Sequence, residues 1–374
     1  MLEVSVSSAE AISGIPKFTS ESKLCDEVMI AYVVTGGTER YLLELYEACK
    51  PKFLLLGAFP KRNSLAAALE ALEGLPKGGL YVIRDERDFL KLRAIANRAS
   101  KLANSKALLI GGVAPWLVEV PQRETLRGVL GLEVIDVGWE EVETAYESSS
   151  VNEEEVKSLV SGASKVEVNI EALERALRLK EALRKLLETY GARSLAINCF
   201  ELIKRMNVTP CLALSLLASA GTPSACEGDL LSLTSQWMSY VAYGVVGGVF
   251  NVVEILDRKV ALAHCTAPIT MLDEYDLVTH YETSVPVAIR GRISPGRDLI
   301  ALRVNRELKD PIIWKGKSVE GPELNACRTQ VWMEVENLYG LKGNHRVAFP
   351  ASSLAELYST LWAFGIRTRE PLPT

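Results

Sequence analysis

The chain has none of the short motifs that mark the commonest nucleotide-binding and acyl-transfer sites. Its 374 residues contain no GxxxxGK[ST] phosphate loop, no GxGxxG turn after a strand and no GxSxG nucleophile elbow. Gly36 and Gly37 form an isolated pair, which a tight strand-to-helix turn explains without a ligand. The sequence therefore gives no support to a P-loop, dinucleotide-binding or serine-hydrolase function.

Histidine and closely spaced cysteine are also scarce. There are three histidines and seven cysteines, and no two cysteines have CxxC spacing, so neither a zinc ribbon nor a disulfide framework is indicated. We expect reduced, mostly buried thiols in a cytoplasmic protein. The start of the chain lacks the basic and apolar regions of a signal peptide. The most apolar run, 241–256, is broken by glycines and polar residues, so it does not predict a membrane span.

The chain also lacks a strong excess of charge of either sign. With 42 basic and 47 acidic side chains the formal net charge is −5, which offers no general attraction for nucleic acid or anionic membranes. Hydrophobic residues make up 48% and charged residues 24%, as in ordinary globular proteins. At about 150 residues per domain, the length predicts two to three domains.

The pattern of apolar runs predicts the fold class. Buried strands are expected at 27–34, 52–56, 80–83, 107–110 and 132–137, with helical stretches between them. A long amphipathic helix over 170–190 and a strand over 193–200 begin a second unit of the same kind. Strands that alternate with helices favour parallel sheets covered on both faces. We therefore expect two flavodoxin-like or Rossmann-like α/β domains, at 1–150 and 151–260.

From residue 261 onward the sequence pattern no longer alternates between strands and helices. Short β-rich runs are separated by Ser-Pro-Gly, Lys-Asp-Pro and Glu-Gly-Pro, which is typical of antiparallel strands closing into a small barrel. We expect a mostly antiparallel, barrel-like C-terminal domain over 261–350. Ser353 and Glu356 form a capping box for a final helix, 351–366, which could pack on the middle domain.

A few polar residues could carry chemistry. Glu227 and Asp229 stand two residues apart at the mouth of a predicted helix, where they could simply favour the helix dipole. The three histidines, His264, His280 and His345, each end a strand-like run near a polar turn. Carboxylates and imidazoles together could form a site for manganese or magnesium.

Several of these segments together resemble the L-fucose isomerase/L-arabinose isomerase superfamily, and most closely its short fucose-isomerase-like members. The resemblance covers most of the chain, although the portion before about residue 25 looks shortened. The segments are 222–229, 263–268 and 343–345, supported by 35–39, 63–70 and 279–283. Their order and spacing carry the match, since no single segment is diagnostic.

The resemblance implies two α/β domains and a barrel-like third, and a manganese-dependent site that interconverts an aldose and a ketose through an enediolate. Glu227 matches the first family carboxylate, which is both a metal ligand and an acid/base group. His345 matches the C-terminal histidine ligand. His264 lies where the arabinose isomerase branch has a further histidine ligand. Homo-oligomers with sites near subunit boundaries are also implied.

The position of the second family carboxylate falls on Asn251. An amide oxygen can hold a cation, but an amide cannot act as a general base. Asp229 is one possible replacement. Glu254 is another, although on a regular strand it would point away from the face of Asn251. Metal binding by Glu227, Asn251, His264 and His345 therefore survives this departure better than turnover does.

These observations leave three functions open. The first is a divalent-metal-dependent sugar isomerase in which Glu227 and the Asn251 position carry the catalysis. The second is a sugar- or metal-binding relative that has lost turnover, and the third is a lyase or epimerase that uses the same intermediate. Because ligands gather beyond the carboxyl ends of parallel strands, Thr38 and Asn63 are candidate sugar contacts, or plain helix-entry residues.

Overall fold

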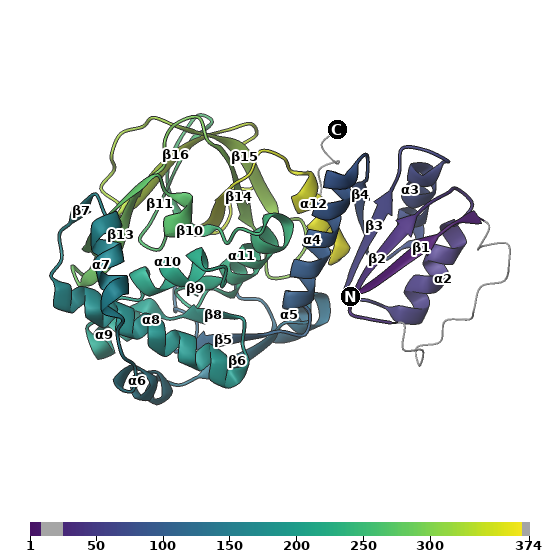
Figure 1. The fold of residues 1–374 in the computed structure, drawn as a ribbon. Coiled ribbons are helices and arrows are strands. Elements are labelled where there is room, and N and C mark those ends of the chain that lie inside the picture. Colours follow the sequence, from purple (N-terminus) through teal and green to yellow (C-terminus); the bar gives the residue numbers. More distant parts are fainter. Residues whose placement is uncertain (9–24, 369–374) are drawn as a thin grey trace.

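The computed structural model describes residues 1–8 and 25–368, and it has a mixed α/β architecture with three β regions (Figure 1). The first is a four-stranded parallel sheet in the order β1-β2-β3-β4. Its strands are β1 (Leu2–Val6), β2 (Val28–Val33), β3 (Phe53–Ala58) and β4 (Gly79–Val82). The central strands β2 and β3 are buried along their whole length, which is why they read as unbroken apolar runs.

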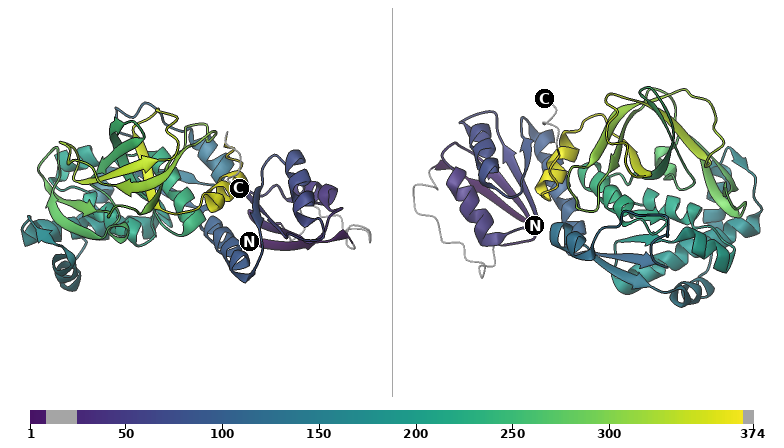
Figure 2. Two further views of the ribbon diagram at one scale, coloured as in Figure 1. Left: turned by 90° about the horizontal axis from the view of Figure 1, so that it is seen from above. Right: turned by 180° about the vertical axis from the view of Figure 1, so that it is seen from behind.

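The two faces of this first sheet are covered from different parts of the chain. The helices α2 (Glu39–Cys49) and α3 (Ser64–Gly74) pack on one face, where they meet Met29, Ala31 and Leu56. Right-handed crossovers that all advance in one direction place their helices on one side, so the other face needs a different cover. That cover is α4 (Glu86–Leu102) and the final helix α12 (Ala355–Ala363), as Figure 2 shows from two sides.

A second four-stranded parallel sheet has the order β6-β5-β8-β9. Its strands are β5 (Lys106–Ile110), β6 (Glu133–Val137), β8 (Ser194–Ile197) and β9 (Ser224–Cys226). The chain leaves β5 toward β6 on one side and later returns to place β8 on the other side, so the winding direction reverses at β5. Helices surround this sheet: α5 (Arg123–Leu130), α6 (Trp139–Glu147), α7 (Glu153–Gly162), α8 (Ile170–Tyr190), α9 (Cys199–Met206), α10 (Cys211–Ser219) and α11 (Leu230–Tyr243).

The C-terminal region confirms the expectation of antiparallel strands. Six strands close into a barrel in the order β10-β11-β16-β15-β14-β17, and every pair in it is antiparallel. They are β10 (Gly248–Leu256), β11 (Lys259–His264), β14 (Asp298–Arg303), β15 (Ile312–Val319), β16 (Thr329–Val335) and β17 (His345–Pro350). Beside the barrel, β12 (Glu274–Thr279) and β13 (Pro286–Arg292) form a small sheet with β7 (Lys165–Val166), and a short 3-10 turn covers Ile269–Met271.

The sheets divide the chain differently from the predicted boundaries. The segment 1–150 supplies strands to two sheets, because β5 and β6 belong with β8 and β9. The barrel starts at Gly248 in β10 and not at residue 261. Residues 351–366 do contain a helix, α12, which packs against α11 of the middle region and also against β4 of the first sheet. Sheet membership depends on long-range pairing, which local apolar patterns do not encode.

The expectation that all thiols are reduced is wrong for one pair. Cys25 and Cys49 are joined by a disulfide, with an S–S distance of 2.09 Å, and the other five cysteines are free and buried. The two are 24 residues apart in sequence, and only the packing of α2 beside β2 brings their Cα atoms to 5.1 Å. None of the helices within residues 1–8 and 25–368 is long and apolar enough to cross a membrane. The shortened portion before residue 25 falls largely outside the described residues.

Candidate metal centre

Glu227 stands in a sharp turn at the carboxyl end of β9. Its backbone is in the left-handed region at φ 59°, which costs an ordinary side chain energy and is common at functional sites. Gly228 follows at φ 66°, and a Cβ added there would lie 2.2 Å from the carbonyl oxygen of Gly112. Only glycine fits that contact. The turn therefore presses against the glycine loop after β5 and holds the Glu227 carboxylate in a buried position, 7% exposed.

Asp229 supports the start of α11, which was one of the two tasks considered for it, and it does not replace the missing base. Its Oδ1 accepts hydrogen bonds from the backbone N–H groups of Leu231 and Ser232, at 2.9 and 3.1 Å, and so caps α11. Its Oδ2 accepts from the Ser232 hydroxyl at 2.6 Å and from His345 Nδ1 at 2.8 Å. Burial would raise the pKa of this carboxyl, but the bonds from His345 and Ser232 hold the pKa well below its usual range. Asp229 is thus a fixed carboxylate that orients His345, and not a free base.

His345 begins β17 and lies between two carboxylates. Its Nδ1 contacts Asp229, and its Nε2 is 3.6 Å from Glu227 Oε1. Burial lowers the pKa of His345, but the hydrogen bond to Asp229 and the negative charges of Asp229 and Glu227 outweigh burial and raise the pKa to about 9. A histidine that donates its Nδ1–H to a carboxylate and presents Nε2 to a site is the usual arrangement of a metal-ligating imidazole.

Asn251 is placed beside His345 by the barrel. The two residues are direct partners across the antiparallel pair β10–β17, so their side chains emerge on the same face. Asn251 Oδ1 and His345 Nε2 are both buried without a hydrogen-bond partner in the described part of the chain. Buried polar atoms normally have partners, and two orphaned atoms on adjacent residues call for an explanation. A cation held between them and Glu227 would satisfy both.

His264 ends β11 and completes a buried cluster with Glu227 and His345. Ligand atoms of these three residues lie within 4.8 Å of one another, so the cluster could hold a metal ion. The ring of His264 is, however, already engaged: its Nδ1 accepts from the Cys265 N–H at 2.8 Å. Burial, with the charge of His345, lowers its pKa to about 4, so the ring is neutral and its single proton is on Nε2.

That tautomer decides how His264 contributes. Its Nε2 lies 3.3 Å from Cys226 Sγ, so the Nε2–H can donate to that sulfur. A protonated Nε2 has no lone pair left for a cation. His264 would have to give up the Cys265 contact before it could bind metal. Glu227, Asn251 and His345 therefore form the better donor set in this geometry.

Glu254 does not join the site. The β10–β11 register does shift between Val252 and Glu254, as a replacement carboxylate would have required. The shift nevertheless brings Val253 to the pocket wall and leaves Glu254 exposed, with its Oε1 accepting from the N–H of Ile255. The bulge overturns the expectation that Asn251 and Glu254 face opposite ways, because they pair with Ala263 and Ala261, which share one face of β11. Glu254 nevertheless does not line the pocket.

Two of the donors, Glu227 and Asn251, line a cavity of about 510 Å³. Trp116, from the loop after β5, donates its Nε1–H to Glu227 Oε2 at 2.5 Å and packs edge-on against Phe200, with ring centroids 5.1 Å apart. The remaining wall is formed by Glu227, Asn251, Val252, Val253, Tyr281, Glu282, Ala326, Cys327 and Asn344. Apolar walls with a few convergent polar groups are typical of small-molecule sites.

Sequence reasoning missed Trp116, Phe200 and Glu282. Trp116 follows the Gly111-Gly112 turn at the carboxyl end of a predicted strand, and that position was a usable signal. Glu282 was quoted only as part of a resembling segment. His280, in contrast, is not a ligand here: it is 5% exposed and contacts Thr283 and Glu282.

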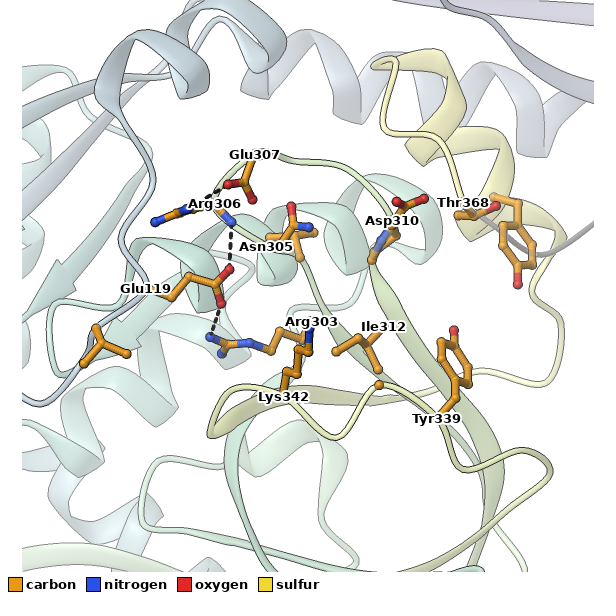
Figure 3. Close-up of a pocket in the computed structure, with 15 residues that line it drawn as sticks. Glu119, Arg303, Asn305, Arg306, Glu307, Asp310, Ile312, Tyr339, Lys342 and Thr368 are labelled. Carbon is orange, nitrogen blue, oxygen red and sulfur yellow. Dashed lines mark hydrogen bonds and ion pairs between the residues drawn. The ribbon is translucent and has the colours of Figure 1, made fainter.

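A second cavity, of about 680 Å³, adjoins the site on the side of Arg303 (Figure 3). Arg303 donates to the backbone oxygen of His345 and to Glu119 Oε2, both at 3.2 Å, while Glu119 Oε1 accepts from the Arg306 N–H at 3.4 Å. Glu119 lies on the same loop as Trp116. One guanidinium therefore ties the Trp116 loop to the strand that carries His345.

The two predicted sugar contacts lie elsewhere, at the carboxyl end of the first sheet. Asn63 lines a pocket of about 540 Å³ together with Thr35, Gly36 and Gly37. Thr38 does not line it, because its side chain is 1% exposed and its hydroxyl donates to the Thr35 carbonyl at 3.1 Å. Neither residue lines the pocket that contains Glu227, so within one chain the structure does not bring the two groups of predicted site residues together.

The residues present fit a divalent cation. The Glu227 carboxylate lies 3.6 Å from the His345 imidazole, and Asn251 with its buried amide oxygen is the strand partner of His345. Hard or borderline cations such as Mn²⁺ and Mg²⁺ accept a set of one carboxylate, one imidazole and one amide oxygen. No protein-family model matches the chain, and no curated protein sequence matches it.

Proposed function

We propose that the protein is a divalent-metal-dependent sugar isomerase of the fucose/arabinose isomerase type, with Mn²⁺ as the leading candidate for its cation. The observation that carries the proposal is the pairing of two orphaned buried atoms, Asn251 Oδ1 and His345 Nε2, beside the Glu227 carboxylate. Glu227 and Asn251 line a cavity of about 510 Å³, which is large enough for a monosaccharide.

Each residue has a task that the contacts define. Glu227 is held by its strained turn and by Trp116, and Asp229 fixes His345 with Nε2 on the side of Glu227. Trp116 and Phe200 offer aromatic surface against which the apolar face of a sugar ring can pack. A bound cation would supply electrostatic stabilisation for two neighbouring sugar oxygens. The resemblance also implies a homo-oligomer. Within each subunit, the pocket at Asn63 is separate from the pocket at Glu227.

A second function is favoured by one observation, the presence of Asn251 where the family has a carboxylate. If no other group moves the proton, the protein binds metal and sugar without turnover. The enzyme and the non-catalytic binder would share the metal site. They differ only in whether the bound sugar is converted to its isomer.

The first experiment measures metal. Purified protein is stripped with chelator and titrated calorimetrically with Mn²⁺ and Mg²⁺, in the wild type and as Glu227→Gln. We expect one site per chain in the wild type and a loss of affinity of at least about 100-fold in the variant, because even outer-shell partners of metal ligands typically contribute 10- to 100-fold. Glu254→Gln, on the exposed side of β10, is the matched control and should bind like the wild type. Equal affinity in all three proteins would remove the proposed metal centre.

The second experiment measures turnover on a panel of aldopentoses, aldohexoses and 6-deoxyaldohexoses with Mn²⁺. We expect ketose formation by the wild type, lost in Glu227→Gln. If the Asn251 position limits the rate, Asn251→Asp raises it, since general bases contribute about 100- to 10,000-fold. Protein that binds Mn²⁺ and sugar but forms no ketose, with or without the aspartate, would support the non-catalytic binder.

A further inference from the structure

The cavity holds one carboxylate that is not among the metal donors. Glu282 lines the same wall as Glu227 and Asn251, and it comes from the turn between β12 and β13. Its side chain is 49% exposed, so it faces the open space of the pocket and not the buried floor. Asp229 and Glu254, the two replacements that the sequence suggested, do not line this pocket.

The turn that carries Glu282 is well ordered by its own bonds. The His280 N–H donates to the Val285 carbonyl at 2.9 Å, and the Ser284 N–H donates to the His280 carbonyl at 3.0 Å. These two bonds close the turn over the side chain of His280, which is buried beneath it. The position of the Glu282 carboxylate therefore follows from a fixed backbone.

His280 lies beside the carboxylate, with its Nε2 3.7 Å from Glu282 Oε2. Its Nδ1 lies 3.1 Å from Thr283 Oγ1, which also accepts from the Val285 N–H. Phe200 packs edge-on against the same ring, with centroids 5.8 Å apart. A buried histidine held by a hydroxyl and an aromatic ring thus stands next to Glu282.

The surroundings of Glu282 also adjust its proton affinity. Burial raises the pKa of Glu282; His280 opposes this effect, and the negative charge of Glu227 adds to it. A carboxyl with a raised pKa exchanges protons closer to neutral pH than an ordinary glutamate does, which suits general acid/base work.

We propose that Glu282 is the second working carboxylate of this site and supplies the proton transfer that Asn251 cannot. The inference rests on the proposed isomerase function. In the forward direction the carboxylate takes the proton from the hydroxyl-bearing carbon next to the aldehyde. The electron pair of that C–H bond becomes the C=C bond of an enediolate, while the C=O π pair moves onto the carbonyl oxygen. The proton of the hydroxyl passes to the former carbonyl oxygen, and Glu282 returns its proton to the terminal carbon. No oxidant or reductant is required.

The test compares Glu282→Gln, which keeps the shape and removes the base, with Glu254→Gln as the control. We expect Mn²⁺ affinity by calorimetry to be unchanged in Glu282→Gln, which separates its role from that of Glu227. Ketose formation should fall by about 100- to 10,000-fold. Deuterium incorporation at the sugar carbons in D₂O, followed by proton NMR, should fall by the same factor, because exchange reports proton abstraction itself.

A further variant distinguishes proton transfer from a structural role. Glu282→Asp should restore part of the rate and move the acidic limb of the rate–pH profile, whereas a merely structural residue would leave that limb in place. An active wild type with undiminished exchange in Glu282→Gln would overturn the role of Glu282 and leave the isomerase standing. A wild type that binds Mn²⁺ but shows neither ketose nor exchange on the whole panel would overturn the isomerase and this inference together.

Discussion

The two parallel sheets have the same number of strands but differ in strand order and in the polar side chains at their carboxyl ends. In the first sheet the order β1-β2-β3-β4 follows the chain, so the described strands contain no reversal of winding direction. In the second sheet the chain turns from β5 to β6 on one side and to β8 and β9 on the other. In open α/β sheets, ligands bind in the crevice where the winding reverses, and the buried donors are found at this end.

The difference extends to the polar side chains. At the end of the first sheet the hydroxyl of Thr38 donates to Thr35, and that of Ser64 donates to Val33, so both serve the local backbone. At the end of the second sheet Asn251 and His345 keep an orphaned atom each. The two turns differ because only the second lies against the barrel. The barrel strands carry Asn251 and His345, whose unpaired polar atoms the local turn does not bind.

The largest expected effect is on the free energy of unfolding when a glycine in each turn, Gly37 or Gly228, is replaced by alanine. Gly37 and Gly228 both have positive φ, but a Cβ at Gly37 would be 4.0 Å from its nearest neighbour, Ser8 Cβ, whereas at Gly228 it would be 2.2 Å from a carbonyl oxygen. Gly37→Ala should destabilise the protein by roughly 1–2 kcal/mol, the cost of a left-handed residue. Gly228→Ala should lose about 3–5 kcal/mol, because a steric clash is added. Chemical unfolding measures both, and equal losses would contradict the tighter turn at the second sheet.

The next effect concerns pH and only the second region. In metal-free protein the pKa of His345 is raised to about 9. The interactions of its charged ring with Asp229 and Glu227 therefore stabilise the fold fully below the unfolded pKa of about 6.5. That contribution, about 3 kcal/mol, is lost as pH rises through 9. The unfolding free energy of wild type minus that of His345→Gln should therefore decrease between pH 6.5 and 9. A difference that stays flat over this range would show that His345 is neutral in the folded protein.

The smallest of the three effects tests the outer support of the site. Asp229→Asn keeps a residue that caps helices well, so α11 should remain intact. It removes the charge that orients His345, and Mn²⁺ affinity should fall by about 10- to 100-fold. Glu39→Gln, at the corresponding helix start of the first sheet, should leave that affinity unchanged. An unaltered affinity in Asp229→Asn would assign Asp229 to helix capping alone.

Much of the fold was predictable because local patterns reflect burial. The helix expected over 170–190 matches α8, and Gly191 ends it in the left-handed conformation that glycine tolerates. The strand expected over 27–34 matches β2, since burial on both faces produces a continuous apolar run. The antiparallel C-terminal region was visible in its turn spacing. The division into sheets was not, because β5 reads the same whether it joins β4 or β8.

The candidate site was predictable only in part. Glu227, Asn251, His264 and His345 came from a resemblance; ligand atoms of Glu227, His264 and His345 lie within 4.8 Å of one another, and Asn251 is the strand partner of His345. Trp116 and Glu282 were missed because neither residue type is unusual in a loop. The disulfide between Cys25 and Cys49 was missed because spacing alone does not show which thiols approach each other.

The sequence by itself determined which segments form strands and helices, because this depends on neighbours within a few residues. The exact ends differed: the strand expected over 193–200 ends at Ile197 in β8, and α9 begins at Cys199. It also determined which residues have the chemistry for a metal. Only the tertiary structure decided that Asn251 lies opposite His345, that Asp229 turns the imidazole, that the ring of His264 is already engaged, and that Glu282 faces the cavity. The physical reason is that these contacts join residues far apart in the chain, and barrel closure and strand order set their distances.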